Sequence, residues 1–202
     1  MLSTSERIDP RAKRTREALQ AAFLALLSER GLRSLTVQDI TAQAGVNRAT
    51  FYAHYLDKYD MFSQLIREQL SDTLSQHSAN PLIFNADGLR TQVVAACTFM
   101  TNVYAGCHVH DDDMEVHIEQ QVQLRLGECL LEGLKDCVQA PNSRIITKEM
   151  TATLTASCIY AAAAVWGAGR TSGKLDDYVS EVMVFVMGAV SACGYGLPTP
   201  AA

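Results

Sequence analysis

The chain of 202 residues is 48% hydrophobic and 19% charged, which suits one large domain, or a small domain joined to a medium-sized one, with a sizeable core. Its six cysteines form no CxxC pair, and the first ten residues lack the apolar segment of a signal peptide. These features argue against a secreted disulfide framework and predict a cytoplasmic protein with reduced thiols.

The net charge of −5 hides an uneven distribution. Residues 1–70 carry ten Lys or Arg and eight Asp or Glu, a net charge of +2, whereas the remaining residues carry seven and 14, a net charge of −7. A mildly basic N-terminal part on an acidic body fits a protein that contacts phosphate at one end only.

The N-terminal pattern predicts three helices in succession. The first lies between Pro10 and Gly31, with an apolar face at a helical period. That face is formed by Ala18, Leu19, Ala22, Phe23, Leu26 and Leu27. A second, short helix is expected after Thr36, whose hydroxyl would cap it together with Asp39. Gly45 would then supply the left-handed or tight conformation that a chain reversal needs. A third helix, capped by Asn47, would end near Tyr55.

The rest of the chain predicts only helices, because no β-type alternation of useful length occurs, so we expect an all-α fold. The predicted helices lie at about 57–80, 89–105, 114–138, 145–169 and 175–192. Residues 151–169 are uncharged and long enough to cross a membrane. They are rich in Ala, Thr and Ser rather than Leu and Ile, and the next uncharged stretch lacks basic flanks, so we expect buried helices of a dimer interface and no membrane contact.

Two helices joined by a tight turn with a glycine form a helix-turn-helix unit, whose second helix lies in the major groove of DNA. On the third predicted helix, Phe51 and Tyr55 can pack inward. The opposite face then carries a guanidinium, two small residues and a phenol, from Arg48, Ala49, Tyr52 and Ala53. Arginine can bond guanine in bidentate fashion, and alanine methyl groups can contact thymine.

The segment LTVQDITAQAGVNRATFYAHYLDKYDMF, residues 35–62, resembles the DNA-binding region of the tetracycline-repressor (TetR) family of bacterial regulators. The resemblance covers about residues 11–70, and the rest of the chain matches only in general layout. It implies a three-helix helix-turn-helix domain at residues 1–60 and a larger helical domain for ligand sensing and dimerisation at 61–202.

The same resemblance implies roles for individual residues. Arg48 and Ala49 would meet base edges, with Ala53 as a further candidate, although many members of the family carry a larger or polar residue there. Five residues would hold phosphates: Thr36, Thr50, Tyr52, His54 and Lys58. Hydroxyl, imidazole and ammonium groups are suited to contacts with the DNA backbone.

Members of this family generally bind a small molecule in the body. The resemblance therefore implies a dimeric repressor that is released from a palindromic operator on double-stranded DNA by a small-molecule effector, with no cofactor. The last two helices of each subunit would pack as a four-helix bundle. Candidate ligand-binding residues on the middle helices are Cys97, Phe99, Met100, Tyr104, Tyr160 and Trp166, each of which also suits ordinary core packing.

The segment GCHVHDDDMEVHIE, residues 106–119, collects thiol, imidazole and carboxylate groups that zinc or copper could use. The metal candidates are Cys107, His108, His110 and His117. The spacing matches no closed zinc pattern, and consecutive acidic residues also suit the N-terminus of a helix. A metal- or redox-sensing regulator of the same fold remains an alternative. A small metal-dependent enzyme is a further one, but the sequence lacks its Glu-x-x-His pairs, so we expect no enzyme.

Overall fold

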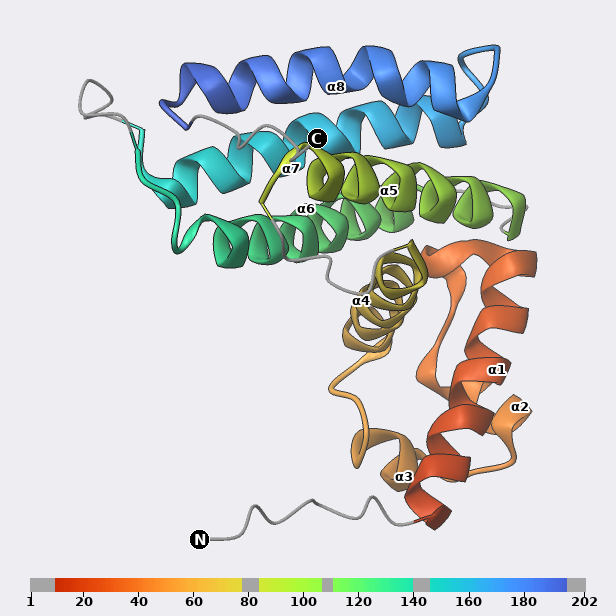
Figure 1. Ribbon diagram of the computed structural model, residues 1–202. Helices are drawn as coiled ribbons and strands as arrows, with labels where there is room; N and C mark the ends of the chain where they lie inside the picture. The colour runs from red at the N-terminus through yellow and green to blue at the C-terminus, as the bar shows by residue number, and fades with distance from the viewer. Residues whose placement is uncertain (1–9, 78–83, 107–110, 140–145, 196–202) are drawn as a thin grey trace, which may run out of the picture. The chain divides into compact units, whose positions relative to one another are not determined.

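The computed structural model describes residues 10–77, 84–106, 111–139 and 146–195. Over these residues the chain forms α-helices and no strand, which confirms the predicted all-α fold (Figure 1). The helices are α1 (Pro10–Ser34), α2 (Val37–Ala44), α3 (Arg48–Tyr52), α4 (Lys58–His77), α5 (Ala86–Gly106), α6 (Asp112–Leu134), α7 (Lys148–Gly167) and α8 (Leu175–Ala192).

The chain divides into two compact units. The first, which we call the head unit, contains the described residues up to Leu65 together with Asp111–Glu115. The second, the body unit, contains the described residues from Ile66 to Gly106 and from Val116 onward. The division therefore falls inside α4, near the predicted domain boundary at residue 60. The first turn of α6 groups with the head unit, which the sequence did not indicate.

The head unit is built on the apolar face of α1, where five of the six predicted residues are buried and Ala18 is exposed. Leu19, Phe23 and Leu27 are buried, and the Phe23 ring lies 6.0 Å from the Phe62 ring of α4. At Gly31 the backbone leaves the helical conformation, with φ of 72°. Only glycine adopts this angle without steric cost, so Gly31 sets the bend that turns the chain toward α2.

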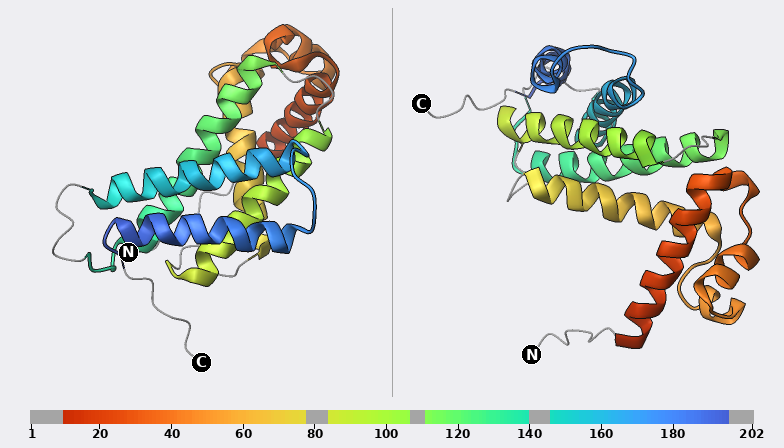
Figure 2. Two further views of the ribbon diagram at one scale, coloured as in Figure 1. Left: turned by 90° about the horizontal axis from the view of Figure 1, so that it is seen from above. Right: turned by 90° about the vertical axis from the view of Figure 1, so that its right-hand side faces the viewer.

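The body unit places α7 and α8 side by side over α5 and α6 (Figures 1 and 2). The approach of α7 to α5 is close, because a Cβ atom on Gly167 would lie 2.7 Å from the Cβ of Met100. The neighbouring residue Trp166 stacks its ring on the Tyr178 ring of α8 at 5.1 Å. The Tyr178 hydroxyl also donates to the carbonyl of Ala162 at 2.9 Å. These contacts fix α7 between α5 and α8.

Within the described part of the chain, α7 alone is long and apolar enough to cross a membrane, with a mean hydropathy of 1.2. One such helix is weak support for a membrane span, because helices of soluble proteins pass the same test. One face of α7, including Thr151, Thr155 and Ile159, is buried in the body unit, and the opposite face is exposed at Leu154 and Val165.

Candidate nucleic-acid interface

The turn between α2 and α3 is held by caps at both ends of α2. The Thr36 hydroxyl accepts from the Asp39 N–H at 3.2 Å, and the Asp39 carboxylate accepts from the Thr36 N–H at 3.1 Å. The Asp39 carboxylate also accepts from the Thr36 hydroxyl. The two hydrogen bonds that this carboxylate accepts from Thr36, the one from its hydroxyl above all, lower the pKa of Asp39 from its usual value of 3.8. At the other end Gly45 has φ of 67°. Both the predicted cap and the predicted left-handed glycine are confirmed.

The third helix is short and is fixed by its own cap. The Asn47 side chain accepts from the Thr50 N–H at 2.8 Å and from the Thr50 hydroxyl at 2.9 Å. Phe51 is fully buried and Tyr55 is 2% exposed, with their rings 5.6 Å apart. The inward packing of these two aromatic residues is confirmed. The helix itself ends at Tyr52, three residues before the predicted end.

The outer face of α3 is open to solvent. Arg48, Ala49, Tyr52 and Ala53 are all exposed, and Tyr52 keeps half of its surface accessible. Arg48 Nη2 donates to the Tyr52 hydroxyl at 3.4 Å, so the guanidinium and the phenol lie next to each other. This face offers a planar donor group, methyl groups and a phenol, which are the groups that contact base edges and phosphates in a major groove.

Lys58, which is predicted to hold a phosphate, has its ammonium bound within the head unit. Its ammonium donates to three backbone carbonyls, those of Leu32, Arg33 and Leu35, at 2.9, 2.9 and 2.8 Å. An ammonium has three N–H groups, so all of its donors are used within the head unit. Lys58 therefore ties the start of α4 to the segment that follows the bend at Gly31.

The other residues predicted to hold phosphates lie beside α3, and some of their hydrogen-bonding groups already have partners within the head unit. The Thr36 hydroxyl donates to Asp39 at 2.5 Å, and the Thr50 hydroxyl donates to Asn47. His54 is half-buried, with its ring 6.3 Å from the Tyr55 ring. Arg48 and Tyr52 are both exposed and lie next to each other, so these two residues dominate the chemistry of the surface.

The first turn of α6 completes the head unit through contacts that are not evident from the sequence. The Asp111 carboxylate accepts from the Arg33 N–H at 2.8 Å, and it also caps α6 by accepting from the Met114 N–H at 2.9 Å. The Tyr59 hydroxyl donates to Asp113 at 3.1 Å. Burial raises the pKa of Tyr59, and this hydrogen bond raises it further. The acidic run was predicted as a helix N-terminus, but its partners in α1 and α4 could not be foreseen.

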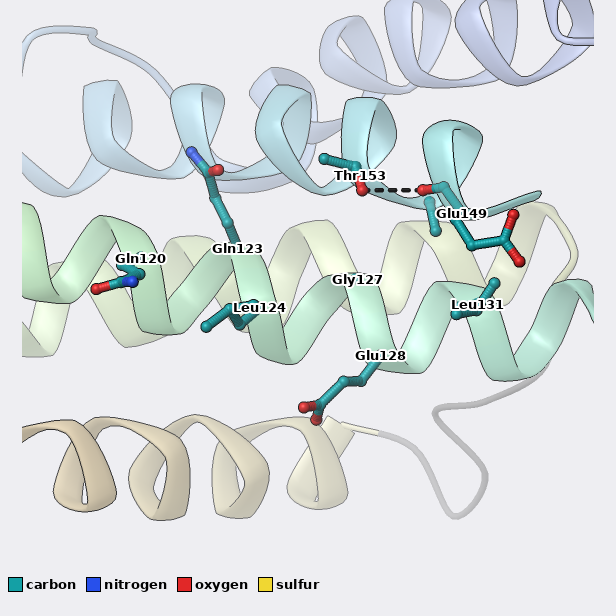
Figure 3. Close-up of a pocket in the computed structure, with 9 residues that line it drawn as sticks. Gln120, Gln123, Leu124, Gly127, Glu128, Leu131, Glu149 and Thr153 are labelled. Atoms are coloured by element: carbon teal, nitrogen blue, oxygen red, sulfur yellow. Dashed lines mark hydrogen bonds between the residues drawn. The ribbon is translucent and has the colours of Figure 1, made fainter. Parts of the chain in front are cut away.

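The six predicted ligand-binding residues lie on α5 and α7. Cys97, Phe99 and Met100 are at most 2% exposed and belong to the packed core, and burial raises the pKa of Cys97 to about 12. Tyr104, Tyr160 and Trp166 are half-buried. A surface groove of about 350 Å³ lies elsewhere in the body unit, between α6 and α7 (Figure 3). None of the six residues lines it.

Of the predicted metal candidates, Cys107, His108 and His110 lie outside the described residues. His117 lies on α6 and is half-buried. In the described ranges, no group of three or more His, Cys, Asp or Glu residues is arranged to hold a metal ion.

Together, the capped turn and the exposed face of α3 define a helix-turn-helix unit of the DNA-binding class. Residues 19–65 match the model of a family described as bacterial regulatory proteins, tetR family. The N-terminal part of this chain is thus similar to the DNA-binding part of that family, as the resemblance seen in the sequence predicts.

Similar proteins share mainly this N-terminal part. The chain is 40% identical over 70 residues to the HTH-type transcriptional regulator YxbF of Bacillus subtilis (strain 168), which is 34% of this chain and 18% of that protein. It is 40% identical over 55 residues to the HTH-type transcriptional repressor BepR of Brucella suis biovar 1 (strain 1330), which is 27% of this chain and 26% of BepR. The match therefore spans about a quarter or less of the length of either relative.

Solved structures extend the similarity to the whole fold. A TetR-family regulator from Streptomyces coelicolor A3 superposes with a TM-score of 0.65 at 15% identity, covering 91% of this chain and 98% of that one. The regulator FadR from Bacillus subtilis, solved in complex with stearoyl-CoA, gives a TM-score of 0.53 at 14% identity, covering 86% and 98%. At this level of identity the comparison establishes the fold, which is that of TetR-family regulators.

Proposed function

We propose that this protein is a transcriptional regulator that binds a palindromic operator as a dimer and is released from it by a small-molecule effector. The observation that carries the proposal is the division of α3 into two faces. Phe51 is buried on one face, while Arg48 and Tyr52 are exposed on the other. A short helix that is anchored on one side and polar on the other fits the major groove. The name of the relative BepR, a repressor, supports repression.

Each exposed residue has a distinct role in this proposal. Arg48 contacts the guanine edge, and Ala49 contacts the methyl group of a thymine. Tyr52 donates to a phosphate, and Thr36, Thr50 and His54 add contacts to the backbone. We leave Lys58 out of this set because its three donors already bind carbonyls of the head unit.

The proposed dimer forms through α7 and α8. Large apolar side chains are exposed on both helices, with exposed fractions of 52% for Leu154, 71% for Val184 and 74% for Phe185. Gly188 on α8 has open space where a Cβ would lie, so another helix can approach its backbone. Exposed apolar surface of this kind favours association, and two copies would form a four-helix bundle. A dimer places its two recognition helices about 34 Å apart, or a multiple of this distance.

Release by an effector follows from linkage. A ligand that favours a different spacing of the two heads lowers DNA affinity by the ratio of its affinities for the two states. The FadR structure, with stearoyl-CoA bound, supports effector binding by this fold. We propose that the protein acts in the cytoplasm, where its DNA is accessible, and that it has no enzymatic activity.

The test is selection of bound fragments from a random duplex library by the purified protein at near-physiological salt. We expect a palindrome, with half-sites separated by a whole number of DNA turns. The Arg48→Ala variant serves as the control, because it should recover a degenerate motif. Enrichment of unrelated sequences, equal for both proteins, would contradict the proposal.

A further inference from the structure

The groove between α6 and α7 is a feature that the helix-turn-helix does not explain, and one of its walls, α7, is also a helix of the proposed dimer. Nine residues line it: Gln120, Gln123, Leu124, Gly127, Glu128 and Leu131 of α6, with Glu149, Ala152 and Thr153 of α7 (Figure 3). Its volume of about 350 Å³ lies within the range of small-molecule sites. From Leu124 to Leu131 the groove follows α6 for about 10 Å, at the helical rise of 1.5 Å per residue.

Gly127 leaves the middle of this groove open. It lies within α6, where glycine is less stable than alanine because of its greater backbone freedom in the unfolded chain. A glycine is usually needed either for a positive φ or for a close approach of another part of the chain, and neither applies here. Gly127 does not have a positive φ. A Cβ there would also meet only the Cβ of Ala156, at an ordinary contact distance of 4.0 Å. The remaining effect of the glycine is to keep the hollow between Leu124 and Leu131 free of side-chain atoms.

The exposed surface of the groove is mostly apolar, although Gln120, Gln123 and Thr153 also line it, and its charged groups are acidic. Leu124 keeps 49% of its surface exposed beside the hollow, which is a large exposed fraction for a leucine. Among the nine residues that the structure places around the groove, none is Lys, Arg or His. Of the two carboxylates, that of Glu149 lies on the α7 side of the groove, whereas the Glu128 side chain points from α6 away from α7 (Figure 3).

The two carboxylates have different partners. Glu128 accepts from Arg67 Nη2 of α4 at 3.0 and 3.1 Å and lies 3.5 Å from Arg125 Nη1. Glu149 forms no ion pair with a Lys or Arg of the described chain, and the ammonium of its neighbour Lys148 instead donates to the carbonyl of Lys135 at 2.7 Å. Hydrogen bonds at the start of α7 lower the pKa of Glu149, so this carboxylate is charged at neutral pH.

From these observations we infer that the groove binds a small amphipathic organic cation, with its apolar part over Gly127 between Leu124 and Leu131 and its cationic group at Glu149. An apolar anion of the same shape would bring like charge to Glu149 and is excluded on that ground. Glu128 connects the groove to Arg67 on α4, the helix that continues into the head unit. That connection bears on DNA binding only if the proposed function is correct, whereas binding in the groove does not depend on it.

The experiment compares two probes of matched shape and opposite charge, 4-phenylbutylammonium and 4-phenylbutyrate, titrated calorimetrically into the full chain without DNA. We expect saturable binding of the ammonium probe and binding of the carboxylate at least about tenfold weaker. Gly127→Leu, which fills the hollow, should weaken ammonium binding by about tenfold or more, and Glu149→Gln should remove the preference for the cation. Gly106→Leu is the matched control, because Gly106 has open space around it and lies away from the groove.

Circular dichroism shows whether each variant keeps its helices, and Glu149→Gln tests the site without changing its volume. Equal affinities of the wild type and Gly127→Leu for the ammonium probe would overturn the inference. So would equal binding of both probes by the wild type, or no saturable binding up to about 10 mM. Because no DNA is present, these outcomes test ligand binding in the groove alone. The fragment selection separately tests DNA binding by the head unit.

Discussion

Replacement of Lys58 by methionine removes the ammonium and keeps most of the aliphatic stem. The three carbonyls that accept from it, at 2.8 to 2.9 Å, then lose a charged donor. Such hydrogen bonds stabilise by about 1.5–3 kcal/mol each when buried, but these are partly exposed and water can replace the donor. We therefore expect the head unit to lose about 2–3 kcal/mol in total, since each bond contributes about 1 kcal/mol under these conditions.

The assay separates a structural role of Lys58 from a phosphate contact. Hydrogen exchange should accelerate in the amides of residues 32–40, while the body unit is unchanged, because only the head unit loses contacts. The salt dependence of DNA binding should keep its slope, since a phosphate contact would change it by about one unit. Lys174→Met, at an exposed position before α8, is the control for loss of a lysine. A reduced slope with unchanged exchange would refute the argument.

Four further predictions concern separate features. Thr36→Ala should destabilise the head unit by about 1 kcal/mol at pH 7, as measured by urea unfolding, because it removes the cap of α2. The folded-state pKa of Asp39 is lowered from 3.8, so the charged carboxylate stabilises the fold at pH values above 3.8. This stabilisation is lost as the pH falls through the lowered pKa. Asp39→Asn should abolish this part of the acid sensitivity. Native protein treated with iodoacetamide at about pH 8 should be alkylated at the half-exposed Cys137. Cys97 should not react, because burial raises its pKa to about 12. Mass spectrometry that finds Cys97 modified as fast as Cys137 would contradict the burial of Cys97. Arg48→Ala should cost about 1–3 kcal/mol on the selected operator and much less on operators changed at the contacted base, and a uniform loss on all sequences would remove its base-reading role.

Local features of the head unit were predictable because they depend on residues close together in the chain. The cap of α2 needs only Thr36 and Asp39, and the end of α2 needs only Gly45. The burial of Phe51 and Tyr55 follows from their spacing of four residues on a helical path. Each of these inferences uses a short stretch in which the backbone conformation follows from residue types.

Features that depend on tertiary placement could not be predicted. The acceptors of Lys58 lie 23 to 26 residues earlier in the chain, and nothing local to Lys58 indicates that they come within reach. The contact of Tyr59 with Asp113 spans 54 residues. The groove depends on how Gly127 of α6 faces Ala156 of α7, and a periodic apolar pattern does not specify the register between two helices.

The contacts of Asp111 and Asp113 with Arg33 and Tyr59 bear on how this protein can be divided by an engineer. A fragment that stops at Leu65 would keep the helix-turn-helix but lose the acceptors that the first turn of α6 supplies to α1 and α4. A chimaera that transfers this head to another sensor should therefore carry two separate segments, the N-terminal one and Asp111–Glu115. Exchange of the first segment alone would join it to a foreign turn, and the hybrid would inherit neither parent's complete set of contacts.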